Sequence, residues 1–126
     1  MEQNQGKKGS LVHSFGYAFQ GIFSTIRSER NMKIHCLAAV LVVIFGIGLK
    51  ISKVEWFVCL ILFGLVMSLE CVNTAVEAIV DMVSKKYQPL AKKAKDAAAG
   101  AVLIAAIFAA IIGLWIFVPK LVSLFL

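Results

Sequence analysis

The stretch that decides the fold is residues 56–81, which read Trp56-Phe-Val-Cys-Leu-Ile-Leu-Phe-Gly-Leu-Val-Met-Ser-Leu-Glu70-Cys-Val-Asn73-Thr74-Ala-Val-Glu77-Ala-Ile-Val-Asp81. Its first half carries no charge and is apolar enough to cross a membrane. Its second half carries polar side chains at helical spacings, and we call these the polar stripe: Glu70, Asn73, Thr74, Glu77 and Asp81. An ionised side chain inside a membrane helix costs about 3 kcal/mol on insertion scales, so the polar stripe is the predicted working site.

The composition restricts the chain to one membrane-embedded domain, residues 1–126. The chain has 126 residues, and 60% of them are hydrophobic, which excludes an ordinary soluble globule. The apolar segments predict an all-α membrane protein with three transmembrane helices, at residues 32–49, 56–83 and 97–118. Basic residues flank these segments and give a net charge of +6, so we expect contact with anionic lipid and no nucleic-acid partner.

Residues 11–30 are predicted to form an amphipathic helix that lies in the membrane interface. Apolar side chains recur there at three- and four-residue steps, at Leu11, Phe15, Ala18, Phe19, Ile22 and Ile26. A helix of a soluble bundle would show the same periodicity, but membrane segments follow directly. At the other end of the chain, Pro119-Lys120 is expected to end the third span.

The basic residues also orient the chain. Ten lysines and arginines belong to the N-terminal side or to the 84–96 connection, with Lys7 and Lys8 among them, against Lys50, Lys53 and Lys120 on the opposite side. Since basic residues are retained in the cytoplasm, both the N-terminus and the 84–96 connection are predicted to be cytoplasmic. Lys85, Lys86, Lys92 and Lys93 are interpreted mainly as contacts to lipid headgroups.

The span at 56–83 is longer than the roughly 20 residues needed to cross a bilayer. Its last turns should therefore project beyond the hydrocarbon, with Glu77 and Asp81 at the headgroups and Glu70 just inside them. A three-span chain has too few helices to enclose the polar stripe, so we expect Glu70 to face lipid unless a neighbouring protomer covers it. The small residues at 97–101 offer a surface for such close helix packing.

The acidic residues near this boundary suit phosphoryl transfer to a lipid hydroxyl. Glu29, Glu77 and Asp81 offer the hard oxygen ligands that Mg²⁺ shares with a polyphosphate, and Lys95 could neutralise phosphate charge. Glu70 lies deeper, in a low-dielectric setting where a carboxylate can act as a general base near neutral pH. In phosphoryl transfer, positioning and charge neutralisation supply most of the catalysis.

Several alternatives remain at this point. Asp96 could be a helix N-cap or first-turn residue, Asn73 could form an interhelical hydrogen bond and nothing more, and Asp81 could be a solvated side chain. His13 and His35 have no ligand set nearby and are expected to form hydrogen bonds only. A proton- or cation-coupled transporter also uses intramembrane carboxylates, but here the carboxylates gather at one boundary. A non-catalytic scaffold would not explain Glu70.

Four segments carry a resemblance to a known family or to one of its branches. The pattern Glu70-x-x-Asn73-Thr74-Ala-x-Glu77-x-x-x-Asp81, followed by Ala94-Lys95-Asp96-x-x-Ala-x-Ala101-Val102, resembles the signature of the prokaryotic diacylglycerol kinase family. The segments Ser14-Phe-Gly-Tyr-Ala-Phe and Glu29-Arg-Asn-Met-Lys-Ile-His35 are more similar to its Gram-positive undecaprenol kinase branch. The resemblance implies an ATP- and Mg²⁺-dependent lipid kinase of the bacterial cell membrane, with undecaprenol as acceptor and diacylglycerol as the alternative.

The resemblance also implies an assembly and a role for each residue. The family fold is a homotrimer of three-span protomers, each with a surface helix, and the active sites are shared between protomers. Glu70 would be the catalytic base, with Ala99 beside it on the lipid-substrate side. The remaining roles would be metal binding by Glu29 and Glu77, nucleotide binding by Tyr17, Glu29, Glu77, Lys95 and Asp96, and support of the site by Asn73 and Asp81.

Overall fold

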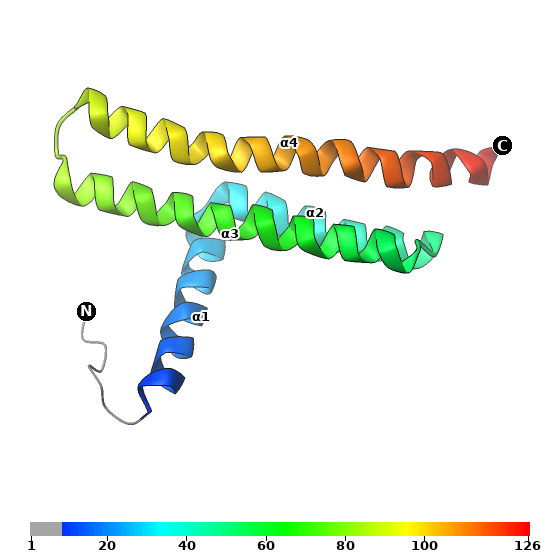
Figure 1. The fold of residues 1–126 in the computed structure, drawn as a ribbon, viewed down its shortest axis with the longest axis horizontal. Helices are drawn as coiled ribbons and strands as arrows, with labels where there is room; N and C mark the ends of the chain where they lie inside the picture. The colour runs from blue at the N-terminus through cyan, green and yellow to red at the C-terminus, as the bar shows by residue number, and fades with distance from the viewer. Residues whose placement is uncertain (1–8) are drawn as a thin grey trace.

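A computed structural model describes residues 9–126, which form four α-helices (Figure 1). The helices are α1 (Ser10–Ser28), α2 (Arg30–Leu49), α3 (Lys53–Val83) and α4 (Pro89–Phe125). By length and composition α2, α3 and α4 can each cross a membrane, which confirms the predicted all-α architecture with three candidate spans. Residues 1–8, with Lys7 and Lys8 of the charge count, lie outside the described part of the chain.

The three candidate spans lie side by side, and α1 leaves them at a steep angle (Figure 1). The longest helices, α3 and α4, pack most extensively against each other, whereas α2 packs mainly against α3. Successive spans run in opposite directions, so the α1–α2 junction lies in the same half of the bundle as the α3–α4 connection, though short of that connection (Figure 1). This arrangement allows Glu29, the end of α3 and the start of α4 to share one boundary.

Glu29 is the single residue that separates α1 from α2. Its backbone is extended (φ −102°, ψ 120°), while its N–H still donates to the carbonyl of Thr25 at 2.9 Å. The predicted helix at 11–30 therefore ends earlier than expected, and α2 begins at Arg30 rather than at residue 32. The break turns the chain from α1 into the bundle and leaves the Glu29 side chain at the corner.

The opposite end of the bundle is closed by a tight turn between α2 and α3. Lys50 adopts a left-handed conformation (φ 53°), which ends α2, and Ser52 caps α3 through a capping box with Glu55. The Glu55 backbone N–H donates to the Ser52 hydroxyl oxygen at 3.1 Å, and the Ser52 N–H donates to the Glu55 carboxylate at 2.8 Å. This cap explains why α3 begins at Lys53, before Trp56.

The last helix extends further at both ends than the predicted span at 97–118. Pro89 occupies its first turn, where a missing N–H is harmless, so Asp96 lies inside α4 and is not an N-cap. The expected end at Pro119-Lys120 is also wrong, because α4 continues through Pro119 to Phe125. A proline removes only one helical hydrogen bond, and an ion pair of 3.3 Å between Lys120 and Glu55 ties this part of α4 to α3.

The core between the helices is small. Its buried apolar side chains are Met32, Ile51, Cys59, Val66, Val102 and Ala105. Large apolar side chains on the outer faces of the spans are exposed, as expected where lipid tails take the place of water. Thr25, Glu70 and Asn73 are the polar residues buried among the described residues, and two of these three belong to the polar stripe.

We predict that Gly46 and Gly48 respond differently to alanine. A Cβ on Gly46 would lie 2.7 Å from the Trp56 indole and 3.1 Å from Ile51, whereas a Cβ on Gly48 meets nothing within 4 Å. Overpacking of this kind costs about 1–3 kcal/mol, so Gly46→Ala should lower the unfolding temperature in detergent micelles. Gly48→Ala is the matched control and should not lower it. Equal unfolding temperatures of the two variants would contradict close packing at the turn between α2 and α3.

Candidate active site

The polar stripe runs from the buried middle of α3 to its exposed end. Glu70 is only 1% exposed and Asn73 is also buried, whereas Thr74 and Glu77 are half-buried and Asp81 is exposed. Because these residues share one helical face, the decrease in burial from Glu70 to Asp81 shows that the neighbouring helices cover the middle of α3 but not its end. The stripe therefore offers carboxylates in two different environments, one dry and one open to the boundary.

Glu70 is enclosed by its own chain. The expectation that a single three-span chain would leave it facing lipid is wrong, because the helices of one chain leave Glu70 only 1% exposed. The imidazole Nε2 of His35 on α2 lies 3.6 Å from Oε2 of Glu70. Neither carboxylate oxygen of Glu70 has a hydrogen-bond partner within residues 9–126. The acidic group is thus shielded but not neutralised by hydrogen bonds.

The middle of the stripe is held by bonds within α3. The Asn73 side-chain amide donates to Oε1 of Glu77 at 3.4 Å, and the Thr74 hydroxyl donates to the backbone carbonyl of Glu70 at 3.0 Å. The partner of the Asn73 amide is therefore one helical turn away on the same helix, and an interhelical hydrogen bond of Asn73 stays a prediction. Its carbonyl oxygen is buried without a partner among the described residues.

Three segments converge at the open end of the stripe. The Glu29 carboxylate from the α1–α2 junction and the Glu77 carboxylate from α3 are close enough to repel each other. From α4, Lys95 attracts Glu77 and pairs with Asp81, with Nζ 2.6 Å from Oδ1. The interpretation of Asp81 as simply solvated is therefore wrong, although both side chains of the pair remain partly exposed.

A groove between the end of α3 and the start of α4 continues from this ion pair. It has a volume of about 450 Å³, and its wall contains Asp81, Lys85, Lys86, Lys92, Lys95 and Asp96. Asp96 pairs there with Lys92, with Oδ2 2.5 Å from Nζ. Three of the four lysines that the sequence assigned mainly to lipid headgroups, Lys85, Lys86 and Lys92, therefore share a groove with Lys95 and Asp96. Four cationic side chains against two carboxylates give this groove a net positive wall.

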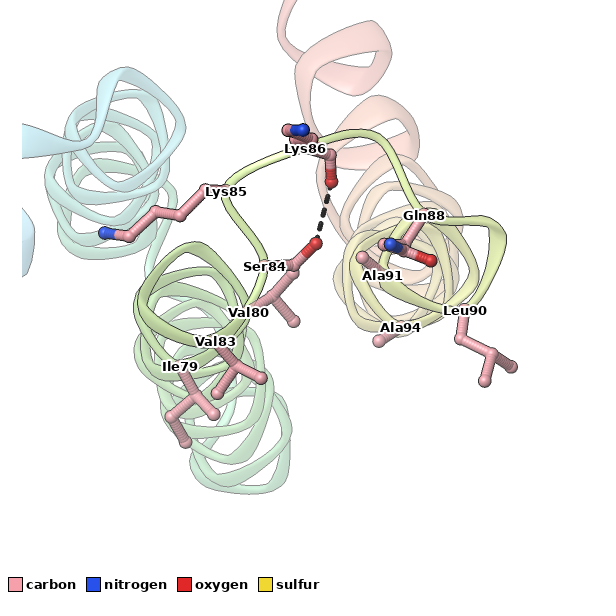
Figure 2. Close-up of a pocket in the computed structure, with 10 residues that line it drawn as sticks. All are labelled: Ile79, Val80, Val83, Ser84, Lys85, Lys86, Gln88, Leu90, Ala91 and Ala94. Atoms are coloured by element: carbon pink, nitrogen blue, oxygen red, sulfur yellow. Dashed lines mark hydrogen bonds between the residues drawn. The ribbon is translucent and has the colours of Figure 1, made fainter.

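A second groove adjoins the first beneath the α3–α4 connection (Figure 2). Its volume is about 670 Å³, and Figure 2 shows Lys85 directed away from α4 and the Ser84 hydroxyl bonded to the Lys86 carbonyl at 2.8 Å. Ile79, Val83 and Leu90 give this groove a largely apolar wall. Polar and apolar surfaces thus meet where the two helices are joined.

Two of the expected site residues are not brought to the stripe. Tyr17 lies on α1 with its side chain 38% exposed, and Ala99 is exposed on α4. In the described part of the chain, no hydrogen bond or ion pair joins Tyr17 to the stripe. Conversely, His35 lies beside Glu70 although the sequence indicated no partner for it. No local spacing could have shown this, since the two residues belong to different helices.

The possible metal ligands are carboxylates at the open end. No group of three or more His, Cys, Asp or Glu side chains within residues 9–126 is arranged to hold a metal ion. Glu29 and Glu77 nevertheless bring two like charges together, a donor set that fits a hard divalent cation whose remaining ligands come from elsewhere.

Comparison with known proteins identifies the family. A family model described as prokaryotic diacylglycerol kinase matches residues 16–117. The chain belongs to this family. Its relatives include an undecaprenol kinase of Bacillus subtilis, 50% identical over 95% of this chain and 98% of the relative. A diacylglycerol kinase of Synechocystis is 42% identical over 91% of this chain and 66% of the relative. A diacylglycerol kinase of Escherichia coli K12 is 32% identical over 80% of this chain and 83% of the relative.

The match to the prokaryotic diacylglycerol kinase family includes the whole candidate site. Its range contains Tyr17, Glu29, the polar stripe, Lys95, Asp96 and Ala99. Only short segments at the two ends of the chain fall outside it. The resemblance found in the sequence motifs is therefore confirmed over nearly the full length.

Proposed function

We propose that this chain is a lipid kinase that transfers the γ-phosphoryl group of ATP to the hydroxyl of undecaprenol. The structural observation that carries the proposal is the position of a buried carboxylate, Glu70, on the same helical face as a charged cluster at the helix end. Undecaprenol is preferred as acceptor because the relative with 50% identity is an undecaprenol kinase. Diacylglycerol is the alternative, since the relatives with 42% and 32% identity are diacylglycerol kinases.

In the proposed reaction Glu70 is the general base. The hydroxyl proton of the acceptor moves to the Glu70 carboxylate while the acceptor oxygen bonds to the γ-phosphorus and the bond from that phosphorus to ADP breaks. A carboxylate with no hydrogen-bond donors on its oxygens keeps both lone-pair sets available for this proton. Burial also excludes water, which would otherwise compete with the lipid hydroxyl as acceptor.

The charged end of the stripe is the proposed nucleotide side. Glu29 and Glu77 would hold Mg²⁺, which when bound neutralises phosphate charge. Lys95 would face the polyphosphate, and its ion pair with Asp81 holds the ammonium at the entrance of the basic groove. Asp96 and Tyr17 would contact the nucleoside part of ATP. A rival transporter function has no support from the family to which the chain belongs.

We also propose a homotrimer in the bacterial cell membrane, with α1 in the interface and the site facing the cytoplasm. The support is that Tyr17 and Ala99 are not joined to the stripe of their own chain. A neighbouring protomer can supply these groups. It is not needed to enclose Glu70, which is already buried within one chain. The charge distribution supports the sidedness, since the α3–α4 connection is rich in lysine.

The proposed function predicts phosphorylation of undecaprenol by the purified protein. Labelled ATP would be supplied with undecaprenol, diacylglycerol or ceramide, and undecaprenol should be the best acceptor. Glu70→Gln should reduce turnover by about 100- to 10,000-fold because the base is lost. Its unfolding temperature should not fall, since a neutral amide is less costly to bury than an unbonded carboxylate. Retention of more than a tenth of the turnover would contradict the role of Glu70.

The Mg²⁺ requirement should depend on both boundary carboxylates. Glu29→Ala and Glu77→Ala are each expected to raise the free Mg²⁺ concentration for half-maximal activity by about tenfold or more, since each removes a hard ligand. Asp81→Asn should have a weaker effect. Glu55→Ala removes a carboxylate at the opposite end of the bundle and serves as the control, with unchanged half-saturation. Unchanged Mg²⁺ titrations for Glu29→Ala and Glu77→Ala would remove both residues from the metal site.

Subunit mixing tests the shared site. Glu70→Gln and Asp96→Asn should each be inactive alone, but mixed oligomers should regain activity, because some interfaces then hold two intact halves. Each variant mixed with itself is the control. If subunit exchange is demonstrated and no activity returns, Glu70 and Asp96 act within one chain.

A further inference from the structure

Glu70 has a neighbour that the mechanism above does not use. His35 Nε2, from α2, lies 3.6 Å from Glu70 Oε2 on α3. The Glu70 side chain is 1% exposed and that of His35 is 20% exposed, so the contact lies between the helices. Within residues 9–126, His35 is the basic side chain that contacts Glu70.

This contact is close enough to become a hydrogen bond but is not yet one. Protein hydrogen bonds between nitrogen and oxygen span about 2.7–3.2 Å. Catalytic hydrogen bonds are often long in the absence of substrate and shorten in the reacting complex. Both Glu70 oxygens have no other donor within the described residues, so nothing competes with the imidazole for Oε2.

The other side of the imidazole is apolar. His35 lines a groove of about 470 Å³ between α2, α3 and α4, and the rest of its wall consists of alanines, larger apolar side chains, Gly113, Cys59 and Met67. In the described part of the chain, the wall of this groove contains no carboxylate or amide that could accept a hydrogen bond from the imidazole in place of Glu70. These apolar surroundings also lower the local dielectric, which strengthens a hydrogen bond made there.

The other charges around Glu70 do not supply such a donor. Glu77, two turns along α3, carries the same charge as Glu70 and repels it. Lys95 of α4 is paired with Asp81, and Glu29 from the α1–α2 junction acts on Glu77. Within residues 9–126, the basic side chain that is placed to donate to Glu70 is therefore that of His35 on α2.

We propose that His35 is a positioning residue for the base. Its Nε2–H donates to Glu70 Oε2, which fixes the carboxylate and leaves Oε1 to accept the proton of the lipid hydroxyl. The inference rests on the proposed function, because it assigns the orientation of that reaction's base. His35 itself touches no reacting atom in this scheme.

The first test compares two substitutions by turnover. His35→Leu keeps the volume and removes the donor, so kcat should fall about 10- to 100-fold, the effect of losing a hydrogen bond to a charged group. The KM for ATP should stay within about twofold, since the nucleotide binds elsewhere. His35→Gln restores a neutral donor of similar reach and should recover most of kcat. Should His35→Leu not fold, His35→Asn, whose amide is one methylene too short, should show the same loss.

The second test asks whether His35 acts through Glu70. In the Glu70→Gln background, His35→Leu should change the residual turnover by less than about twofold, because the group that His35 orients is already lost. A repeated 10- to 100-fold loss there would mean that His35 acts on packing and would overturn the inference. Failure of His35→Gln to recover kcat in folded protein would overturn it as well.

The two proposals fail in different ways. If the wild-type protein phosphorylates no lipid alcohol, the proposed function is wrong and this inference falls with it. If the wild type is active and Glu70→Gln is inactive, but His35→Leu keeps the wild-type kcat, only the role of His35 is overturned.

Val42→Ala, in the same groove on α2, is the control for a change of groove shape and should keep kcat.

Discussion

The structure depends on the burial of one carboxylate between membrane helices. Glu70 is nearly fully enclosed, yet its oxygens have no hydrogen-bond partners among the described residues. Such a group destabilises a fold, because desolvation of an acidic side chain is not offset there by donors. The neighbouring helices must therefore hold it in place, and α2 contributes the contact between His35 and Glu70. A fold that tolerates this penalty keeps a carboxylate whose oxygens are free to accept a proton.

The length of α3 then separates a dry region from a charged one. Its 31 residues span about 46 Å, more than the roughly 30 Å of a hydrocarbon core. We propose that this excess carries Glu77 and Asp81 to the water boundary and leaves Glu70 within the hydrocarbon. The break at Glu29 and the short connection before Pro89 bring the neighbouring segments back to that same end. Lys95 meets Asp81 because α4 returns directly beside α3.

Much of this fold is visible in the sequence, since helical periodicity and apolar length are local properties. The polar stripe, the three spans and the family motifs all follow from spacing along the chain. The helix ends were less predictable: no motif marks the extended backbone of Glu29, and α4 continues through Pro119 beside the ion pair of Lys120 with Glu55 on α3. The enclosure of Glu70 and its contact with His35 join different helices, and no spacing in one helix encodes such a contact.

The geometry of α3 also restricts where the proposed transfer can occur. Glu70 and Glu77 are seven residues apart, so about 10 Å separates the proposed base from the proposed metal side along the helix. A lipid hydroxyl near Glu70 and a phosphate near Glu77 can meet only between them, at the level of Asn73. Asn73 is buried there, donates to Glu77 and keeps a carbonyl oxygen without a partner among the described residues. In the proposed reaction its amide would therefore lie where the two substrates approach each other, which would give a physical reason for a polar residue at this depth.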